Sequence, residues 1–276
     1  MGAIITLTTD FGLSDGYVAA MKGVILSINP EAKLIDICHT IRPQDIAQAA
    51  FVLSTAYPFF PKGTIHLVVV DPGVGTERRA IILRTPSADF VAPDNGVLSY
   101  VIAPPAEGGD HSRQRELGPG MEAVAITKPQ FWRSPVSPTF HGRDIFAPVA
   151  ARLSLGLAPE QFGERISSLT VLPIPRPHKQ ANGSLVGRIL HIDAFGNLIT
   201  NIRAEDLPQA KDTLTIKLRG RLIRGISRTY AQGEELLALI GSSGYLEVSL
   251  REGSARELLR AEVGDEVTII NPKGGW

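Results

Sequence analysis

Three acidic residues each follow an apolar run that is typical of a buried β-strand. Asp10 follows IITLTT, Asp71 follows IHLVVV, and Asp94 comes soon after a third, shorter run that ends at Ala92. In an open α/β sheet, ligands bind beyond the carboxyl ends of the strands. The spacing therefore predicts that three carboxylates gather at one edge of a sheet, where they can bind a polar ligand.

A guanidinium and an imidazole add to this set. The loop after Asp71 is DPGVGTERR, and it brings Arg78 close behind the carboxylate. A guanidinium next to a carboxylate keeps it ionised and oriented. His141 precedes an expected helix in TFHGRDIF, where an imidazole can orient a nucleophile or relay its proton. Taken singly, these features are also explained by a glycine turn, a structural ion pair and an ordinary histidine.

Two turns in the second half of the chain carry polar and aromatic side chains. HIDAFGNLITN places Asp193, Phe195 and Asn197 within one turn, and GSSGY places Ser242 in another. The simplest interpretation is a pair of β-turns, which favour these residue types. An aromatic ring between a carboxylate and an amide can also stack on a base and anchor a polar ligand, so both interpretations stay open.

Several common catalytic motifs are absent from the sequence. It has no G-x-G-x-x-G after the first expected strand, and no G-x-x-x-x-G-K-[ST], G-x-S-x-G or H-E-x-x-H. The sequence therefore argues against dinucleotide redox chemistry, P-loop phosphoryl transfer, a lipase-type triad and a zinc protease. The histidine spacing gives no metal signature, so no metal ligand is assigned.

Composition narrows the class of protein further. The 276 residues include 28 basic and 28 acidic side chains, so the chain lacks the positive excess of a typical nucleic-acid binder. The single cysteine, Cys38, excludes an intramolecular disulfide. No apolar run approaches the ~20 residues that cross a bilayer, and the first residues do not resemble a secretory signal. We therefore expect a cytoplasmic protein without membrane or nucleic-acid partners.

Strand and helix patterns alternate in the first half. Strands are expected at Ile4–Thr9, Leu34–Cys38, Ile65–Val70, Ala80–Arg84, Asp89–Ala92 and Ala123–Thr127, and helices at about 16–29, 45–57 and 143–155. The run IHLVVV is continuously apolar and rich in β-branched residues, as in a strand covered on both faces of a parallel sheet. The order β-α-β-α-β predicts an α/β domain of three layers with a mainly parallel sheet.

The second half has a different character. Most of 104–138 has loop composition, and 173–184 is rich in Pro, Gly and polar residues and is the best linker candidate. Short strands are expected at 185–193, 198–202, 213–219, 222–227, 236–240, 245–250 and 266–270, with one short helix at 254–260. Closely spaced short strands predict a small β-barrel. The expected domains are an α/β domain over 1–175 and a β-barrel domain over 176–276.

Six segments of the chain resemble one enzyme family. TTDFG, DPGVGTERRA, APDNG, TFHGRDIFAP, IDAFGN and GSSGYLEV occur in this order and span nearly the whole chain. They are similar to the S-adenosyl-L-methionine (SAM) hydroxide adenosyltransferases, also called adenosine-forming SAM hydrolases, which are relatives of fluorinase and chlorinase. The resemblance implies an N-terminal α/β domain and a C-terminal β-barrel. It also implies a homotrimer that binds SAM between the N-terminal domain of one subunit and the C-terminal domain of the next.

The resemblance also implies roles for particular residues. The family's catalytic set maps onto Asp71, Arg78 and His141. The implied substrate-binding residues are Asp10, Phe140, Asp193, Phe195, Asn197, Tyr230, Ser242, Leu250, Glu252 and Ala255. Asp10 would hold the ribose hydroxyls and Phe140 would form a wall of the pocket.

The remaining implied contacts fall in the second half. Asp193 and Asn197, with help from Ser242, would hold the amino and carboxylate groups of methionine. Phe195 and Tyr230 would flank adenine, and backbone groups near Leu250, Glu252 and Ala255 would read its edge.

The implied reaction is attack of water at C5′ of SAM, giving adenosine and L-methionine. The leaving group departs as a neutral thioether, so the reaction needs neither a metal nor a cofactor. The halogenases carry a tyrosine at the position of Asp71 and a serine at that of Gly142. This chain keeps the hydrolase pattern, so halide is the less expected nucleophile.

Three alternatives accompany this hypothesis. The chain can be a SAM-dependent halide adenosyltransferase, or a protein that binds SAM or adenosine without turnover. It can also be a metal-dependent hydrolase that uses Asp10, Asp71 and Asp94. The full set of Asp71, Arg78 and His141 argues against a pure binding protein, since binding alone does not require it.

Overall fold

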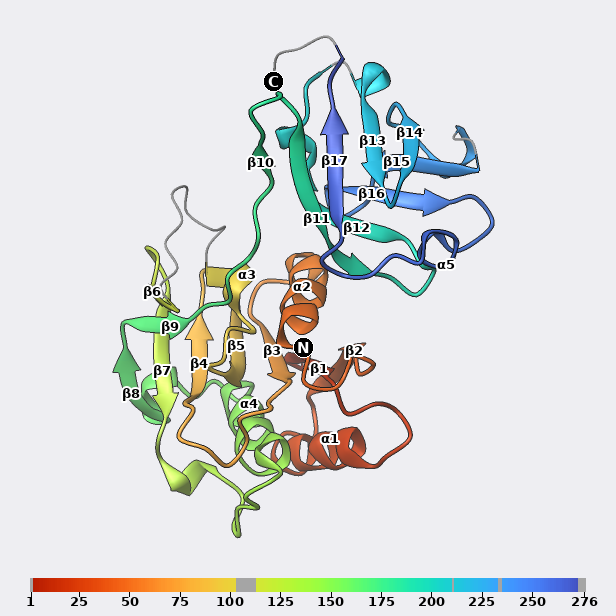
Figure 1. Cartoon of the computed structure of the whole chain (residues 1–276). Helices are drawn as coiled ribbons and strands as arrows, with labels where there is room; N and C mark the ends of the chain where they lie inside the picture. Colours follow the sequence, from red (N-terminus) through yellow and green to blue (C-terminus); the bar gives the residue numbers. More distant parts are fainter. Residues whose placement is uncertain (1, 103–112, 210, 233–234, 273–276) are drawn as a thin grey trace. The chain divides into compact units, whose positions relative to one another are not determined.

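The chain forms two compact units that divide between Pro173 and Ile174. The structure is a computed structural model that describes residues 2–102, 113–209, 211–232 and 235–272 (Figure 1). The expected loop over 104–138 therefore lies partly outside the described residues. Each unit has its own apolar core.

A seven-stranded mixed sheet forms the centre of the N-terminal unit, in the order β2-β1-β3-β5-β4-β7-β8. The strands are β1 (Ile4–Thr9), β2 (Lys33–Cys38), β3 (Thr64–Val69), β4 (Ala80–Arg84), β5 (Ala88–Pro93), β7 (Glu122–Ile126) and β8 (Gly163–Ile166). All point the same way except β4 and β8, which run antiparallel to their neighbours. The sheet is mostly parallel, as the sequence predicts.

Helices cover both faces of this sheet (Figure 1). The helices are α1 (Tyr17–Ile28), α2 (Ile46–Ala56), α3 (Ser99–Ile102) and α4 (Ala147–Leu153), with a π-helix, η3, over Gly142–Phe146 and 3₁₀ turns at Tyr57–Phe59, Pro129–Phe131 and Pro159–Gln161. One core combines α1 and α4 with alternate residues of β1 and β3, such as Leu67. The other combines α2 and α3 with the intervening residues, such as Val68. The three-layer prediction is confirmed.

Local sequence explains where these elements begin and why they are buried. Asp45 caps α2, because its side chain accepts a hydrogen bond from Gln48 N at 2.8 Å. All six residues of β3 are buried, including the polar residues Thr64 and His66, as expected for a strand in the middle of a layered sheet. The observed strand begins and ends one residue before the expected strand over 65–70.

Three short strands of the N-terminal unit were not predicted, and neither was the two-residue strand His178–Lys179 in the expected linker. β8 and β9 (Ser168–Thr170) lie near the end of the N-terminal unit, and β6 (Gln114–Glu116) pairs with β9 in a separate two-stranded sheet. These strands are short, polar and partly exposed, so they lack the apolar alternation that marks a strand in the sequence.

The C-terminal unit is an antiparallel sheet curled into a barrel, in the order β14-β13-β17-β11-β12-β16-β15, with β10 paired to β11. Its strands are β10 (His178–Lys179), β11 (Leu185–Ile192), β12 (Leu198–Arg203), β13 (Thr215–Leu218), β14 (Arg221–Arg224), β15 (Leu236–Ile240), β16 (Tyr245–Leu250) and β17 (Glu266–Ile270). A bridge between Ser227 and Leu239 brings the two ends of the sheet together. The helix α5 (Ala255–Leu259) follows β16, and short 3₁₀ turns occur at Ala204–Asp206, Lys211–Thr213 and Tyr230–Gln232. The predicted small barrel is confirmed.

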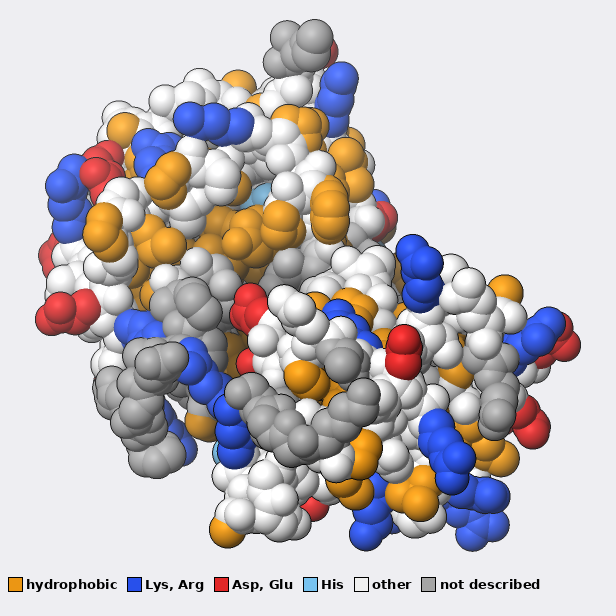
Figure 2. Space-filling view, turned by 90° about the horizontal axis from the view of Figure 1, so that it is seen from above, with side chains coloured by type: hydrophobic (Ala, Val, Ile, Leu, Met, Phe, Trp, Pro, Cys, Tyr) orange, Lys and Arg blue, Asp and Glu red, His pale blue; other side chains and the backbone are white. Residues whose placement is uncertain are grey.

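Charged side chains are interspersed with apolar ones on the surface. Figure 2 shows basic and acidic groups distributed among hydrophobic patches on the face in view, in keeping with a formal net charge of zero. None of the helices in the described part of the chain combines the length and the hydropathy that a membrane-spanning helix requires.

Candidate active site

Three segments of the N-terminal unit meet at the carboxyl ends of β1 and β3. The parallel register pairs Thr9 with Val69, so Asp10, one residue later, and Asp71, two residues later, emerge at the same edge of the sheet. The start of the π-helix supplies the third segment. Together with Tyr17, Pro43 and Gln44 they line an open cavity of about 380 Å³, which is within the range of small-molecule sites. Its lining residues are Asp10, Phe11, Tyr17, Pro43, Gln44, Val69, Asp71, Pro72, Val74, Thr139, Phe140, His141 and Gly142.

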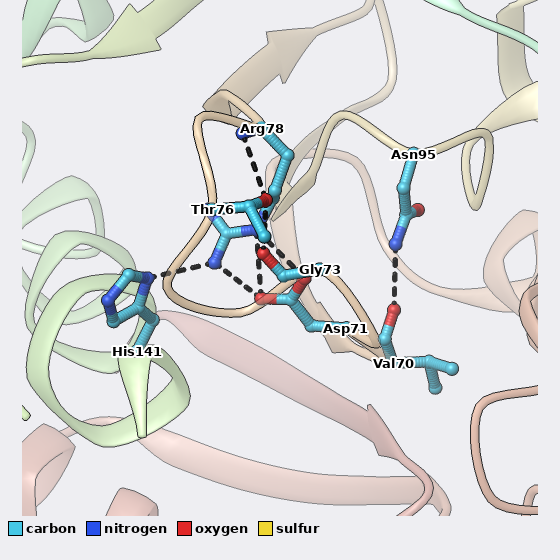
Figure 3. Close-up of polar contacts among 7 residues, drawn as sticks. All are labelled: Val70, Asp71, Gly73, Thr76, Arg78, Asn95 and His141. Carbon is cyan, nitrogen blue, oxygen red and sulfur yellow. Dashed lines mark hydrogen bonds and ion pairs between the residues drawn. The ribbon is translucent and has the colours of Figure 1, made fainter. Parts of the chain in front are cut away.

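Asp71, Arg78 and His141 form a continuous chain of polar contacts at this cavity (Figure 3). Arg78 Nε donates to both carboxylate oxygens of Asp71, at 2.8 and 3.0 Å, and Arg78 Nη2 also donates to Asp71 Oδ2. The same Nη2 lies 2.9 Å from His141 Nδ1. The side chains of Asp71 and Arg78 are 6% and 11% exposed. The sequence hypothesis that these three residues come together is therefore matched by the geometry.

The contact with Arg78 fixes the tautomer of His141. A guanidinium only donates hydrogen bonds, so Nδ1 must accept and the neutral ring carries its proton on Nε2. Burial lowers the pKa of His141, and the positive charge of Arg78 lowers it further, while Asp71 and Asp144 act in the opposite direction. The imidazole is therefore neutral near pH 7 and offers an Nε2–H donor.

Glycines let the loop after β3 take its shape. Gly75 has φ = +77°, and a Cβ there would lie 2.6 Å from the backbone oxygen of Pro138. The loop is closed by Thr76, whose Oγ1 donates to Gly73 O at 2.7 Å (Figure 3). The glycine-turn interpretation of DPGVGT is thus correct, and the same turn holds Arg78 against Asp71.

Asp10 is oriented by a residue in an unusual backbone conformation. Gln44 N donates to Asp10 Oδ2 at 2.8 Å. Gln44 has φ = +66°, a left-handed conformation that is rare for residues other than glycine. This turn lies just before the Asp45 cap of α2, so the start of that helix and the orientation of Asp10 are linked.

An aromatic wall was only partly predicted. The rings of Phe11, Tyr17 and Phe140 are mutually tilted or edge-on, with centroids 5.2 to 5.7 Å apart. The sequence hypothesis named Phe140 alone. Phe11 and Tyr17 stand in DFGLSDGY beside Asp10, and that proximity to a candidate carboxylate is the signal that could have found them.

Asp94 does not join this cavity. Its carboxylate is 3% exposed, accepts from Arg79 Nε at 2.8 Å and accepts from Thr170 N at 2.7 Å. It therefore anchors β9, and the expectation that three strand-end carboxylates gather in one site is wrong for Asp94. In the described part of the chain, no three His, Cys, Asp or Glu side chains are grouped so as to hold a metal ion.

The C-terminal unit organises its candidate residues through local turns. Asp193 Oδ1 accepts from the backbone N–H groups of Phe195 and Asn197, both at 2.9 Å, and its Oδ2 accepts from Asn197 Nδ2 at 2.9 Å. Gly196, with φ = +82°, packs so closely on Ser254 that a Cβ would lie 2.1 Å from Ser254 Oγ. The ring of Phe195 is left 78% exposed.

Tyr230 is held by a buried acid. Its hydroxyl donates to Glu247 Oε1 at 2.8 Å, and Ser249 Oγ donates to the same oxygen at 2.8 Å. Burial and the neighbouring Glu247 raise the pKa of Tyr230 to about 12, so its hydroxyl stays protonated.

The remaining expected binding residues also fall in the C-terminal unit. Ser242 lies in the turn between β15 and β16, and Leu250 ends β16 and bridges to Gly253. Glu252 is exposed with φ = +57°, and Ala255 is fully buried at the start of α5. The structure thus gathers Asp10, Asp71, Arg78, Phe140 and His141 in one unit and the other expected residues in the second. Their substrate contacts stay predictions.

The fold and the site define a class of protein: a layered α/β unit with a carboxylate–guanidinium–imidazole set at its strand ends, followed by a small β-barrel. Comparison with known families agrees in both units. The SAM hydroxide adenosyltransferase N-terminal domain matches residues 5–163, and the C-terminal domain of the same family matches residues 187–268. The chain belongs to the SAM hydroxide adenosyltransferase family.

Related proteins extend over nearly the whole chain. A protein from Methanocaldococcus jannaschii named (R)-S-adenosyl-L-methionine hydrolase is 37% identical, over 97% of this chain and 95% of its own length. A protein of the same name from Thermus thermophilus is 37% identical over 95% and 97%. A fluorinase from Nocardia brasiliensis is 29% identical over 96% of each chain. The crystal structure of an uncharacterized conserved protein from Thermotoga maritima superposes with a TM-score of 0.84 at 37% identity, covering 96% of this chain and 99% of that one.

Proposed function

We propose that this chain hydrolyses SAM at C5′ to adenosine and L-methionine. The observation that carries the proposal is the hydrogen-bonded Asp71–Arg78–His141 chain at a cavity in a member of this family. Relatives named as SAM hydrolases, at 37% identity over almost the full length, support the same reaction.

The leaving group sets what the site must do. The bond between C5′ and the sulfonium sulfur breaks, and its electron pair returns to sulfur, which leaves as the neutral thioether of methionine. That departure needs no general acid, metal or other cofactor. The difficult partner is water, which must approach C5′ in line with the breaking bond and lose a proton.

Asp71 and His141 offer complementary contacts to such a water. Asp71 accepts a hydrogen bond from one O–H of the water and thereby stabilises the positive charge that develops on the water as it attacks. His141 Nε2–H donates to the water oxygen and leaves its second lone pair to attack C5′. Because Nδ1 is already bonded to Arg78, His141 orients the water, and the proton leaves by way of Asp71 to solvent. This assignment narrows the sequence hypothesis, in which His141 either oriented the water or relayed its proton.

The residues around Asp71 and His141 support the proposed reaction. The cavity is walled by Val69, Val74 and the Phe11–Tyr17–Phe140 cluster. Once the substrate covers this open cavity, its apolar walls help to exclude other waters, which strengthens the electrostatic contacts inside. Asp10 lies in the same cavity, and a carboxylate can accept hydrogen bonds from both hydroxyls of a ribose.

We also propose that the C-terminal unit of a neighbouring subunit completes the substrate site. The exposed ring of Phe195 and the ring of Tyr230 suit adenine, and the Asp193–Asn197 turn with Ser242 suits the amino-acid end. The family resemblance adds a homotrimer with this site at a subunit boundary, and a cytoplasmic location remains the expectation.

Halide transfer is the closest competing reaction. A halide at the same position would face the negative charge of Asp71, which disfavours its binding. Water gains a hydrogen bond from the same carboxylate, so the site favours water. A binding protein without turnover would have no use for a water-orienting set.

Isotope labelling tests the proposal directly. The protein is incubated with SAM and chloride in H₂¹⁸O, and the products are separated by chromatography and weighed by mass spectrometry. We expect methionine and adenosine that carries ¹⁸O at the 5′ oxygen. Formation of 5′-chloro-adenosine would establish halide transfer instead, and no product at high protein concentration would favour the binding protein. Loss of activity with a chelator would support the metal-dependent alternative.

A further inference from the structure

A buried carboxylate next to the site is not used by the proposed reaction. Asp144 is fully buried within the π-helix Gly142–Phe146 and is not part of the cavity lining. It accepts from Arg143 Nε at 2.7 Å and Nη2 at 2.8 Å, and from the backbone N of Ser137 at 2.9 Å. Arg133 Nη1 lies 3.5 Å from its Oδ1. A buried charge requires such partners, and they show what it holds in place.

These contacts close the segment that carries two site residues. Ser137 N is bound by the Asp144 side chain, while Asp144 N donates to Phe140 O at 3.2 Å. The segment between them includes Phe140 and His141, which both line the cavity. The Arg143 guanidinium, held by Asp144, lies 5.0 Å above the ring centroid of Phe140. One carboxylate therefore fixes the backbone before His141, and through Arg143 it also fixes the ring beside it.

The π-helix gives the segment a second constraint. Its first residue, Gly142, is packed so tightly that a Cβ would lie 3.2 to 3.3 Å from Val69, Met21 and Phe140. A π-helical turn is rare and often occurs at functional sites. With Gly142 packed against the sheet and Asp144 bound to Ser137, the ring of His141 has little freedom to move away from Arg78.

We propose that Asp144 is a positioning residue, which holds His141 so that its Nδ1 accepts the hydrogen bond from Arg78 and its Nε2–H faces the nucleophile. This inference rests on the proposed function for its kinetic consequence, while the position of His141 is a property of the protein alone. The charge of Asp144 also acts on His141 directly, since it opposes the lowering of the His141 pKa by burial and by Arg78.

The alternative is that Asp144 only stabilises the fold, as a buried ion pair can do anywhere. The two roles differ in what a conservative change disturbs. Asp144→Asn keeps the size of the side chain and an oxygen that can accept from Ser137 N, but it loses the charge-assisted pair with Arg143. Asp89→Asn is the matched control. Asp89, on β5, forms a similar two-bond pair with Arg84, on β4, and does not line the cavity.

The first measurement is kinetic. We expect Asp144→Asn to lower kcat by about 10- to 100-fold with little change in KM, because small misplacements of a catalytic group cost that much. Asp89→Asn should leave kcat near the wild-type value. In a His141→Gln background, Asp144→Asn should have little further effect, since the group it positions is gone. Equal losses of kcat in both backgrounds would overturn the proposal.

The second measurement does not depend on activity. Nitrogen-15 NMR of histidine-labelled protein, with His141 assigned from the His141→Gln spectrum, reports the tautomer and the pKa of that ring. We expect Asp144→Asn to lower the pKa of His141 and weaken the acceptor signature of Nδ1, and Asp89→Asn to change neither. An unchanged His141 signal would overturn the proposal even if the wild type forms no adenosine.

A second variant covers the case in which Asp144→Asn does not fold. Arg143 is 31% exposed, and Arg143→Lys keeps the positive charge while it removes the two-bond fork to Asp144 and the planar contact with the Phe140 ring. We expect a smaller loss of kcat in the same direction and a smaller change at His141. A folded Arg143→Lys protein with wild-type kcat and an unchanged His141 signal would count against the positioning role.

Discussion

The two units of the chain fix their candidate site residues in opposite ways. In the N-terminal unit, Asp71 and His141 are 70 residues apart in sequence and are joined through Arg78 by side-chain hydrogen bonds. In the C-terminal unit, the carboxylate of Asp193 accepts its hydrogen bonds from groups within five residues, namely backbone N–H groups and the side-chain amide of its own turn. The first arrangement depends on the packed sheet, and the second is built from local turn geometry.

This difference separates two tasks. Side chains linked across a sheet keep a fixed distance from one another, which a reacting group requires. A turn that satisfies its own carboxylate presents its remaining groups to a ligand, and in this unit the exposed ring of Phe195 is such a group. We therefore expect substitutions in the N-terminal set to lower turnover and substitutions in the C-terminal turn to weaken binding.

The largest expected effect is at Asp71. Asp71→Asn keeps the shape but loses the charge that pairs with Arg78 and that, in the proposed reaction, accepts the water proton. We expect kcat to fall by about 10²- to 10⁴-fold, the usual contribution of a positioned acid–base group. The dissociation constant of SAM, measured by calorimetry, should change much less. Wild-type turnover in this variant would remove Asp71 from the mechanism.

Asp193→Ala gives the opposite pattern. It removes three side-chain hydrogen bonds that orient the Asn197 amide and the backbone N–H groups of Phe195 and Asn197, while two backbone hydrogen bonds of the turn remain. Lost hydrogen bonds of this kind weaken binding by roughly 10- to 100-fold. We expect KM for SAM to rise by that factor while kcat at saturation falls little. A large loss of kcat with unchanged KM would contradict the division between the units.

Asp10 tests whether binding and turnover are also separated among the residues of the N-terminal unit. Asp10 lies in the same cavity as Asp71, but its proposed role is to hold the ribose hydroxyls. Asp10→Ala should weaken SAM binding by about 10-fold, in line with the loss of a charge-assisted hydrogen bond. Titration calorimetry measures the affinity for SAM in the wild type and the variant. The affinities for adenosine and 2′-deoxyadenosine, compared in the same way, report the contact of Asp10 with the ribose hydroxyls. An unchanged SAM affinity would exclude Asp10 from the ribose site.

The pH profile gives the smallest change and sharpens the role of His141. Burial and Arg78 lower the pKa of His141 from the ordinary histidine range near 6.5, so the ring takes up its proton at a lower pH than a free imidazole does. Protonation at lower pH puts a second positive charge against Arg78 and abolishes acceptance at Nδ1. We expect kcat to be flat around neutrality and to fall only below that range. His141→Gln should lose this acid limb, and an acid limb that persists in the variant would assign it to another group.

Much of the fold was predictable because its signals are local. The continuous apolar run before Asp71 predicted the fully buried strand β3, and Asp45 marked the start of α2. The polar strand β9 was missed, because it is held by its pairing with β6 and by the contact of Thr170 with Asp94. For the same reason Asp94 was assigned to the wrong place, since its partner lies 76 residues further along the chain.

The candidate site was predictable in its residue types more than in its geometry. The spacing in DPGVGTERR predicted the pair of Asp71 and Arg78, which the structure shows. It gave no information on which nitrogen of His141 meets Arg78, and that contact decides whether the ring donates or accepts. The aromatic wall was incomplete in the sequence, because Tyr17 and Phe140 are 123 residues apart and meet only after folding.

Arg78 and Arg79 are consecutive, yet they bind different carboxylates. Arg78 holds Asp71 at the cavity, and Arg79 holds Asp94 away from it. Both stand immediately before β4, where successive side chains point to opposite sides. Because pairing with β5 and β7 fixes the register of β4, it also decides which guanidinium reaches which carboxylate. A slip of β4 by one residue would turn Arg78 away from Asp71, so the register of the sheet itself keeps the cavity residues together.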